Sequence, residues 1–368
     1  MKLLSVVGAR PNFMKIAPFI KAVNKHQSDN LTPNIEHLLV HTGQHYDSKM
    51  SDVFFQHLGI PEPDYNLDIG SGSHAYQTGQ TMIEFEKVLL KENPDLVIVV
   101  GDVNSTIACS LTAVKLGIKI AHIEAGLRSF DRSMPEEINR VLTDAISDFL
   151  FVTEKSGMDN LIREGVSSEK IFFVGNLMID SLISSLPLID ESKILSNLKI
   201  NPKEYIVLTL HRPSNVDDYE KLKQIVDLIN VISEKKKVIF PIHPRTSKNL
   251  EQFNLYNELN NSNAHFVEPL GYLDFIKLVK ESFIVLTDSG GIQEETTFLG
   301  VPCITLRNTT ERPVTVEIGT NYLVGEDISK VYDYIKLIFE GKNKIGSIPE
   351  LWDGNSANRV LNILINNL

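Results

Sequence analysis

Short runs of apolar residues alternate with amphipathic segments along almost the whole chain. A run such as 96–100 (LVIVV) predicts a strand buried on both faces, which is typical of a parallel sheet. The segments between the runs follow a glycine or a polar turn and have apolar residues at helical spacing. In the first half, the predicted strands are 3–8, 35–41, 96–100, 118–123, 150–153 and 171–174, and the predicted helices are 13–23, 47–58, 78–90, 105–116 and 135–149.

The pattern loosens into mixed polar and apolar residues over 176–201, which we interpret as the connection between two domains. The alternation then restarts, with predicted strands at 206–210, 238–242, 284–286, 303–306 and 322–324 and predicted helices at 219–233, 275–279, 291–299, 328–339 and 357–366. Strands and helices that alternate in this way predict a doubly wound parallel sheet. We therefore predict two Rossmann-like α/β domains with a cleft between them, the first over 1–175 and the second over 176–354.

Length and composition agree with this prediction, because 368 residues are too many for one typical core. The net charge is −11 and the longest basic run is 235–237, so nucleic acid is not an expected partner. Nothing approaches the ~20 apolar residues of a membrane span, and the N-terminus does not resemble a signal peptide. Cys109 and Cys303 lie in apolar segments, which indicates a reducing compartment. We expect a cytoplasmic protein with no membrane partner.

The segment 286–300 (LTDSGGIQEETTFLG) predicts a candidate anion site. Ser289, Gly290 and Gly291 fall where a turn passes into a helix. The first N–H groups of a helix have no partner inside it, and the helix dipole adds partial positive charge there. The two glycines let a ligand approach this backbone closely. The alternative interpretation is an ordinary Ser/Gly helix start.

Ligands of open α/β sheets bind outside the C-terminal ends of the strands, and polar residues gather at these positions in this chain. They are Arg10, Lys15, Asp102, Asn104, Ser105, His122, Glu124, Arg128, His211, Arg212, His243, Arg245, Asp288, Arg307 and Arg312. Because the chain as a whole is acidic, this concentration of basic residues predicts an anionic ligand, most simply a diphosphate.

Several of these candidates have a simpler alternative explanation. Asp102 would also serve as a helix cap. Glu136 and Arg140 are four residues apart on one predicted helix, where a surface ion pair is common. Glu295 falls in the first turn of a helix, where the dipole alone favours carboxylates.

Neither a metal nor a nicotinamide cofactor is expected. His41, His45 and Asp47 have metal-like spacing, but no further ligand follows at a diagnostic distance. The segment 70–75 (GSGSHA) matches a dinucleotide fingerprint only loosely, and we interpret it as a flexible loop.

Eight motifs follow one another over nearly the whole chain. They are GARPNFMK (8–15), TGQHYD (42–47), GDVNST (101–106), HIEAGLRS (122–129), PEEINR (135–140), LHRPSNVD (210–217), DSGGIQEE (288–295) and TTERPV (309–314). Together they resemble the non-hydrolysing UDP-N-acetylglucosamine 2-epimerases. The resemblance implies the glycosyltransferase-B fold with the active site between the domains, the final helix at 355–368 packed back on the first domain, and a homodimer. It also implies reversible conversion of UDP-GlcNAc to UDP-ManNAc without a cofactor.

The chemistry of that reaction explains the residue types. The C2 hydrogen of GlcNAc has no adjacent carbonyl, so direct deprotonation is implausible. Anti elimination of UDP gives a 2-acetamidoglucal, and protonation of C2 on the other face with re-addition of UDP gives the epimer. Such an enzyme must hold UDP after the C1–O bond breaks and must offer proton-transfer groups on both faces of C2.

The resemblance assigns roles to the candidate residues, which divide into a catalytic group and a substrate-binding group. The catalytic group is Asp102, Glu124 and Glu136 as carboxylates of the cleft, and His211 near the leaving phosphate. The substrate-binding group is Arg10, Ser289, Gly290 and Gly291 at the diphosphate, Glu295 at the ribose, Phe275 near uracil, and Lys15, Arg140, His243 and Arg312 elsewhere at the site. Which carboxylate takes the first proton stays open.

The chain departs from family members that UDP-GlcNAc activates. Those members carry a second Gln where this chain has Asp47, and His-Arg-Arg-Glu where it has HRPS (211–214), so activation by substrate is not expected. Four alternatives remain: a 2-epimerase of a related UDP-sugar such as a UDP-diacetamido-uronic acid, a hydrolysing 2-epimerase, a retaining glycosyltransferase, and a nucleotide-sugar binding protein. The last two are disfavoured, because no insertion forms an acceptor groove and a binding protein does not need three carboxylates together.

Overall fold

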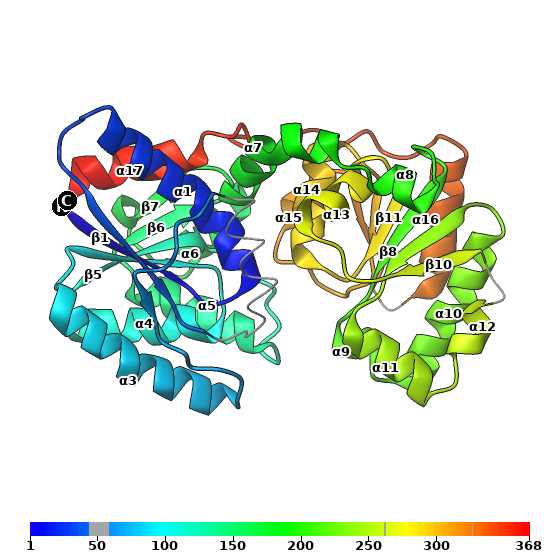
Figure 1. Cartoon of the computed structure of the whole chain (residues 1–368), viewed down its shortest axis with the longest axis horizontal. Coiled ribbons are helices and arrows are strands. Elements are labelled where there is room, and N and C mark those ends of the chain that lie inside the picture. The colour runs from blue at the N-terminus through cyan, green and yellow to red at the C-terminus, as the bar shows by residue number, and fades with distance from the viewer. Residues whose placement is uncertain (44–58, 261–262, 326) are drawn as a thin grey trace. The chain divides into compact units, whose positions relative to one another are not determined.

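The computed structural model describes residues 1–43, 59–260, 263–325 and 327–368, apart from the side chains of Arg10 and Asn260. The chain divides into two compact units, one formed by Met1–Ser184 with Glu350–Leu368 and the other by Ser185–Pro349. Each unit contains one parallel sheet with helices on both of its faces (Figure 1). Among the helices of the described residues, none is long and apolar enough to cross a membrane.

The first unit has seven strands in the order β3-β2-β1-β4-β5-β6-β7. The strands are β1 (Lys2–Val7), β2 (Glu36–His41), β3 (Tyr65–Asn66), β4 (Leu96–Val100), β5 (Lys119–Ala125), β6 (Phe149–Val152) and β7 (Ile171–Phe173). The helices are α1 (Arg10–Ser28), α3 (His74–Glu92), α4 (Asn104–Lys115), α5 (Pro135–Ile146), α6 (Lys155–Arg163), the 3₁₀ turn η1 (Ser168–Lys170) and α17 (Ser356–Asn367), while α7 (Leu177–Glu191) leads into the second unit. Every residue of β4 is buried, as its continuous apolar run predicts for a central strand.

The second unit has six strands in the order β10-β9-β8-β11-β12-β13. The strands are β8 (Tyr205–Thr209), β9 (Lys237–Pro241), β10 (Ala264–Val267), β11 (Ile284–Thr287), β12 (Cys303–Thr305) and β13 (Asn321–Leu323). The helices are α8 (Ile194–Leu198), α9 (Pro213–Val216), α10 (Tyr219–Ser233), α11 (Pro244–Gln252), α12 (Tyr256–Asn260), α13 (Tyr272–Lys280), α14 (Gly290–Leu299), α15 (Pro313–Glu317) and α16 (Ile328–Phe339). Alternate residues of β8 enter two apolar clusters, because successive side chains of a strand point to opposite faces of the sheet.

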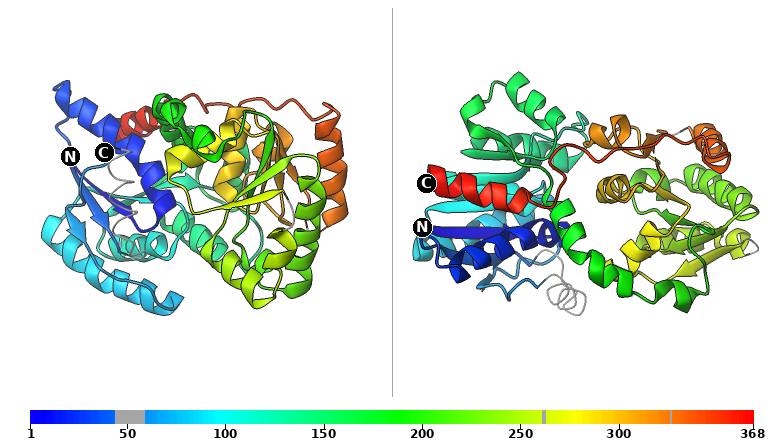
Figure 2. Two further views of the ribbon diagram at one scale, coloured as in Figure 1. Left: turned by 45° about the vertical axis from the view of Figure 1, so that its right-hand side comes forward. Right: turned by 90° about the horizontal axis from the view of Figure 1, so that it is seen from above.

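The last segment of the chain belongs to the first unit, where α17 packs beside α1 (Figure 2). The indole Nε1 of Trp352 donates to the carbonyl of Thr153 at 3.1 Å, and Asp180 Oδ2 accepts from the backbone N–H of Ala357 at 2.8 Å. Gly175 has a φ of +88°, and a Cβ at this position would lie 2.1 Å from the carbonyl oxygen of Leu351. The segment is therefore fixed by close backbone contacts as well as by apolar burial.

The predicted fold class is confirmed, but some predicted elements are not. The helix predicted over 135–149 ends at Ile146, because Asp148 accepts from the N–H of Ile120 at 3.0 Å and Phe149 joins β6. The segment 176–201, predicted as an irregular connection, contains α7 and α8. The prediction did not include β10, α6, α9, α11, α12 and α15, which are elements of nine residues or fewer. The helix predicted over 47–58 lies outside the described residues.

Candidate active site

The start of α14 combines two glycines with two buried guanidinium groups. Ser289 is the N-cap of the helix and Gly290 is its first residue. A Cβ at Gly290 would lie 3.1 Å from Arg312 Nη1 and 3.6 Å from Arg307 Nη1, so both guanidiniums lie beside the first turn. Two cations at the positive end of a helix favour an anion at this place. The predicted Ser289, Gly290, Gly291 and Arg312 are therefore brought together.

Ion pairs hold both guanidiniums in place. Arg307 donates to both carboxylate oxygens of Glu311, with Nη1–Oε2 at 3.1 Å and Nη2–Oε1 at 2.8 Å. Arg312 Nε lies 2.8 Å from Glu294 Oε1. All four side chains are buried, so each carboxylate offsets the cost of burying its guanidinium. Arg307 is among the polar residues that follow predicted strands, but the resemblance assigns it no role. Its position after β12 is the sequence signal for a site residue.

His211, which follows β8, is held by a buried carboxylate. Asp288 Oδ1 lies 2.9 Å from His211 Nδ1, and Asp288 is fully buried while the imidazole is 42% exposed. The His243 ring lies 5.7 Å from the His211 ring, between centroids, and its Nδ1 accepts from the N–H of Arg245 at 3.2 Å. Desolvation lowers the pKa of His243, and the neighbouring His211 and Arg245 lower it further.

The other substrate-binding residues predicted in this unit lie on α13 and α14. Glu295 is buried next to Tyr272, and desolvation together with this carboxylate raises the pKa of the Tyr272 hydroxyl well above its ordinary value. Phe275, one turn along α13 from Tyr272, is half-buried and packs on an apolar cluster. Arg245 is engaged elsewhere, since its Nε donates to Asp217 at 2.8 Å.

In the first unit, Lys15 and Glu124 form a buried ion pair between Lys15 Nζ and Glu124 Oε2. Glu124 lies near the end of β5 at an irregularity of the strand, and its φ of +74° is uncommon for a residue with a Cβ. A Cβ at Gly101, which follows β4, would lie 3.4 Å from Glu124 Oε2 and 3.6 Å from Lys15 Nζ. Lys15, which follows β1, and Glu124, near the end of β5, thus meet beside Gly101, which follows β4, at one edge of the sheet, as predicted.

Asp102 lies beside this pair, after Gly101. Its carboxylate is half-exposed, and its Oδ2 lies 2.5 Å from Arg140 Nη2. The N-cap of α4 is Val103, so the alternative explanation of Asp102 as a helix cap is wrong.

Arg140 connects Asp102 to α5. Its Nη1 contacts Glu137 Oε2, and Glu137 also accepts from the backbone N–H of Ser129 at 2.9 Å. Glu136 is exposed in the first turn of the helix. The alternative of an ion pair between Glu136 and Arg140 is therefore wrong, because Arg140 pairs with the neighbouring Glu137 instead.

A profile described as UDP-N-acetylglucosamine 2-epimerase matches residues 28–365. The chain belongs to this family. Membership of the UDP-N-acetylglucosamine 2-epimerases, which the motifs predicted, is confirmed.

Individual members of the 2-epimerase family are similar over the full chain. A UDP-N-acetylglucosamine 2-epimerase of Methanocaldococcus jannaschii is 47% identical over 99% of both chains. The crystal structure of that organism's UDP-GlcNAc 2-epimerase in complex with UDP-GlcNAc and UDP superposes with a TM-score of 0.89, at 46% identity and over 100% of both chains. A UDP-2,3-diacetamido-2,3-dideoxy-D-glucuronate 2-epimerase of Pseudomonas aeruginosa is 45% identical over 88% of both chains. A lipopolysaccharide galactosyltransferase with a TM-score of 0.58 and 14% identity shares the fold alone, over 100% of both chains.

The sequence of this member of the 2-epimerase family pointed to His122 and Arg128, but Asp144 and the buried network that joins the three residues were not predicted. His122 on β5 contacts the Gly101 carbonyl through Nε2 at 2.8 Å and Asp144 Oδ1 through Nδ1 at 2.6 Å. Asp144 Oδ2 accepts from the N–H of Gly126 at 3.0 Å and lies 2.7 Å from Arg128 Nη1. Burial would raise the pKa of Asp144, but His122 and Arg128 outweigh it and lower the pKa. The network fixes the backbone at Gly101, next to Asp102, and at Gly126, two residues after Glu124.

Some predictions fall outside the described part of this 2-epimerase-family chain. They are the side chain of Arg10 and the residues His45 and Asp47. Within the described residues, no group of three or more His, Cys, Asp or Glu is arranged to hold a metal ion.

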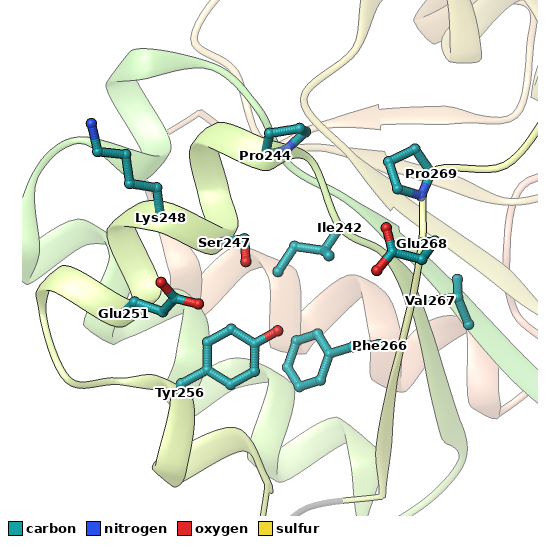
Figure 3. Close-up of a pocket in the computed structure, with 10 residues that line it drawn as sticks. All are labelled: Ile242, Pro244, Ser247, Lys248, Glu251, Tyr256, Phe266, Val267, Glu268 and Pro269. Atoms are coloured by element: carbon teal, nitrogen blue, oxygen red, sulfur yellow. The ribbon is translucent and has the colours of Figure 1, made fainter. Parts of the chain in front are cut away.

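A cavity of about 510 Å³ lies in the second unit, at the C-terminal ends of β9 and β10 (Figure 3). Its aromatic pair is Tyr256 and Phe266, whose rings are 4.9 Å apart. The residues that line it include none of the predicted site residues, although its Ile242 and Pro244 flank His243.

Proposed function

We propose that the chain catalyses reversible epimerisation of UDP-GlcNAc to UDP-ManNAc at C2, by anti elimination and re-addition of UDP through a 2-acetamidoglucal. The observation that carries the proposal is the glycine start of α14 with the guanidiniums of Arg307 and Arg312 beside Gly290. This arrangement suits the diphosphate of UDP, which must stay bound to the enzyme after the C1–O bond to the sugar has broken. The relative from M. jannaschii whose complex with UDP-GlcNAc and UDP is known supports the same substrate.

The two units would contribute different parts of the reaction. The second unit supplies diphosphate contacts at Ser289, Gly290 and Gly291, and its Glu295 is assigned to the ribose. The first unit supplies Asp102, Glu124 and Glu136 for proton transfer at C2, on opposite faces of the sugar. One carboxylate takes the C2 proton as the C1–O electron pair leaves with UDP, and the C1=C2 double bond forms. Another returns a proton to the opposite face before UDP re-adds.

Deuterated water provides the test of this function. The protein is incubated with UDP-GlcNAc in D₂O, and the products are followed by ¹H and ¹³C NMR. We expect a mixture of UDP-GlcNAc and UDP-ManNAc with deuterium at C2 of both, because the proton abstracted from C2 exchanges with solvent. Free ManNAc in place of UDP-ManNAc would show a hydrolysing enzyme instead, and absence of turnover would contradict epimerisation of this substrate.

A second candidate substrate is a UDP-diacetamido-uronic acid. The observation that favours it is the relative from P. aeruginosa, whose identity of 45% is close to the 47% of the UDP-GlcNAc enzyme. Comparing kcat/KM for the two UDP-sugars in parallel decides between them. We propose UDP-GlcNAc because the relative named for that substrate matches 99% of the chain, against 88% for the other.

We also propose that the protein forms a homodimer through α3 and α5. Tyr76, Ile83 and Leu90 are exposed at intervals of seven residues, so they share one face of α3. On α5, Ile138, Val141 and Leu142 are exposed on one face as well. Apolar stripes of this kind favour association with another protein surface.

Ile83→Asp is expected to dissociate this dimer, because it puts a charge on the apolar stripe of α3. The dissociation constant should rise at least about 30-fold, the effect of losing one contact of about 2 kcal/mol. Light scattering after gel filtration measures the mass against the 41.3 kDa of one chain. Ile162→Asp is the matched control, since Ile162 is similarly exposed but lies on α6. A dimer that both variants leave intact would place the interface elsewhere.

A further inference from the structure

Asp288 directly follows β11 and precedes Ser289, the N-cap of α14. Its two carboxylate oxygens bind different groups. Oδ2 accepts from the backbone N–H of Arg212 at 2.9 Å and from Asn215 Nδ2 at 3.1 Å. Oδ1 lies 2.9 Å from His211 Nδ1. The backbone N–H of His211 lies 3.2 Å from Oδ1 and 3.1 Å from Oδ2. Oδ2 therefore organises the turn after β8, and Oδ1 holds the imidazole.

The proton positions follow from the chemistry of the two groups. An ionised carboxylate is only an acceptor, so the nitrogen facing it must carry the hydrogen. Burial would raise the pKa of Asp288, but the hydrogen bond and charge of His211 and the N–H of Arg212 lower it overall, so Asp288 is ionised near neutral pH. His211 Nδ1 is therefore protonated. Nε2 is left as the ring nitrogen that can exchange a proton.

We propose that Asp288 is a positioning residue for the epimerisation, because it fixes His211 in the form whose Nε2 exchanges a proton with the leaving diphosphate. The inference rests on the proposed function. Before the reaction His211 is the imidazolium, with hydrogen on both ring nitrogens. As C1–O breaks, the electron pair passes to the β-phosphate oxygen, the Nε2 proton moves to that oxygen, and neutral His211 keeps its hydrogen on Nδ1 facing Asp288. When UDP re-adds, the same oxygen bonds to C1 and the proton returns to Nε2. Asp288 stays ionised and offsets the positive charge of the imidazolium.

Adjacent strands hold His211 and the anion site close to each other. β8 and β11 are neighbouring parallel strands with Thr209 opposite Thr287, and the two hydroxyls are 2.7 Å apart. The N–H of Ser289 donates to the hydroxyl of Thr287 at 3.0 Å. His211 and the start of α14 are thus fixed to adjacent strand ends, which keeps Nε2 at a constant place relative to a phosphate bound at Gly290.

Asp288→Asn tests the inference with little change in shape. An asparagine whose oxygen replaces Oδ2 keeps the contacts to Arg212 and Asn215 and places an amide N–H against His211 Nδ1. Nδ1 then becomes an acceptor, and neutral His211 carries its hydrogen on Nε2. Donation of this proton would leave an imidazolate anion, whereas donation from the wild-type imidazolium leaves a neutral ring. We expect ¹⁵N NMR of histidine-labelled protein, assigned with His211→Gln, to show this reversal. The value of kcat should fall about 10²–10⁴-fold, as expected for a wrong tautomer, with little change in KM.

Asn215→Ala is the control for a merely structural role. It removes the contacts of Asn215 with Asp288 and with the Leu306 carbonyl at 3.0 Å, but it leaves the contact between Oδ1 and Nδ1. The wild-type tautomer should persist in this variant. An Asp288→Asn protein with the wild-type tautomer, or with wild-type kcat, would overturn the inference. The NMR result needs no substrate. A tautomer change from wild type to Asp288→Asn, together with absence of turnover in the wild-type protein, would therefore refute the proposed function and still support the positioning of His211.

Discussion

Glu124→Gln is expected to lower kcat for epimerisation by about 10³-fold, within the usual contribution of a general acid–base group. The carboxylate lies near the end of β5, buried against Lys15 and close to Gly101. Glutamine preserves the shape but cannot accept or return a proton. The affinity for UDP should change less than about threefold, because the diphosphate contacts belong to α14 and are not made by this residue. Deuterium incorporation at C2 gives kcat, and calorimetry gives the UDP affinity.

Because Glu124 is paired with the buried Lys15, a second variant is needed to separate loss of stability from loss of catalysis. In Glu124→Gln the buried ammonium of Lys15 loses its carboxylate, and an unpaired buried charge destabilises the fold. Lys15→Met combined with Glu124→Gln removes both charges, so thermal stability should recover while kcat stays low. A single variant that keeps more than about a tenth of wild-type kcat would exclude Glu124 as a proton-transfer group.

Arg128→Met is expected to reduce the free energy of unfolding of the first unit by roughly 3–5 kcal/mol at pH 7, the usual cost of removing one partner of a buried ion pair. Arg128 contacts Asp144, and both side chains are 1% exposed. Trp352 is the single tryptophan of the chain and is buried in this unit, so its fluorescence in urea reports the unfolding. Arg163→Met, at an exposed position of α6, should change the same quantity by less than about 0.5 kcal/mol.

The effect of Arg128→Met should also depend on pH. The pKa of Asp144 is lowered in the folded chain, so its ion pairs add stability above the unfolded pKa of about 3.9. That stability is lost as the pH falls through the lower pKa of the folded state. The difference between wild type and variant should therefore shrink on acidification from pH 7 towards pH 3. A difference that stays constant over this range would mean that Arg128 acts through packing and not through its charge.

The sequence predicted the edge of each sheet where the polar residues gather, because the ends of buried parallel strands can be read from apolar runs. Asp102, Glu124, His211 and Asp288 all lie at such ends. Strand periodicity and the position of a turn are local properties, so they need no knowledge of the tertiary structure.

Partners across the fold could not be predicted in this way. Glu136 and Glu137 both have a spacing that allows an ion pair with Arg140, and the choice depends on the contact of Glu137 with the Ser129 loop. The approach of Arg307 to Gly290 depends on the turn after β12, which the sequence pattern does not define. The ion pair of Arg307 with Glu311 could not be predicted for the same reason. The helix α7 was missed because its Ser and Pro residues obscure a helical pattern that packing stabilises.

The return of residues 350–368 to the first unit has a consequence for biosynthesis. A chain made from its N-terminus usually completes its domains in the order of their synthesis. Here the surface that binds Trp352 and α17 is made before the second unit, but Trp352 and α17 are made after it. The second unit is contiguous in sequence and can fold as soon as residues 185–349 are made, whereas the first unit keeps part of its apolar surface open until residues 350–368 have followed. The unit that begins the chain is the last to be completed.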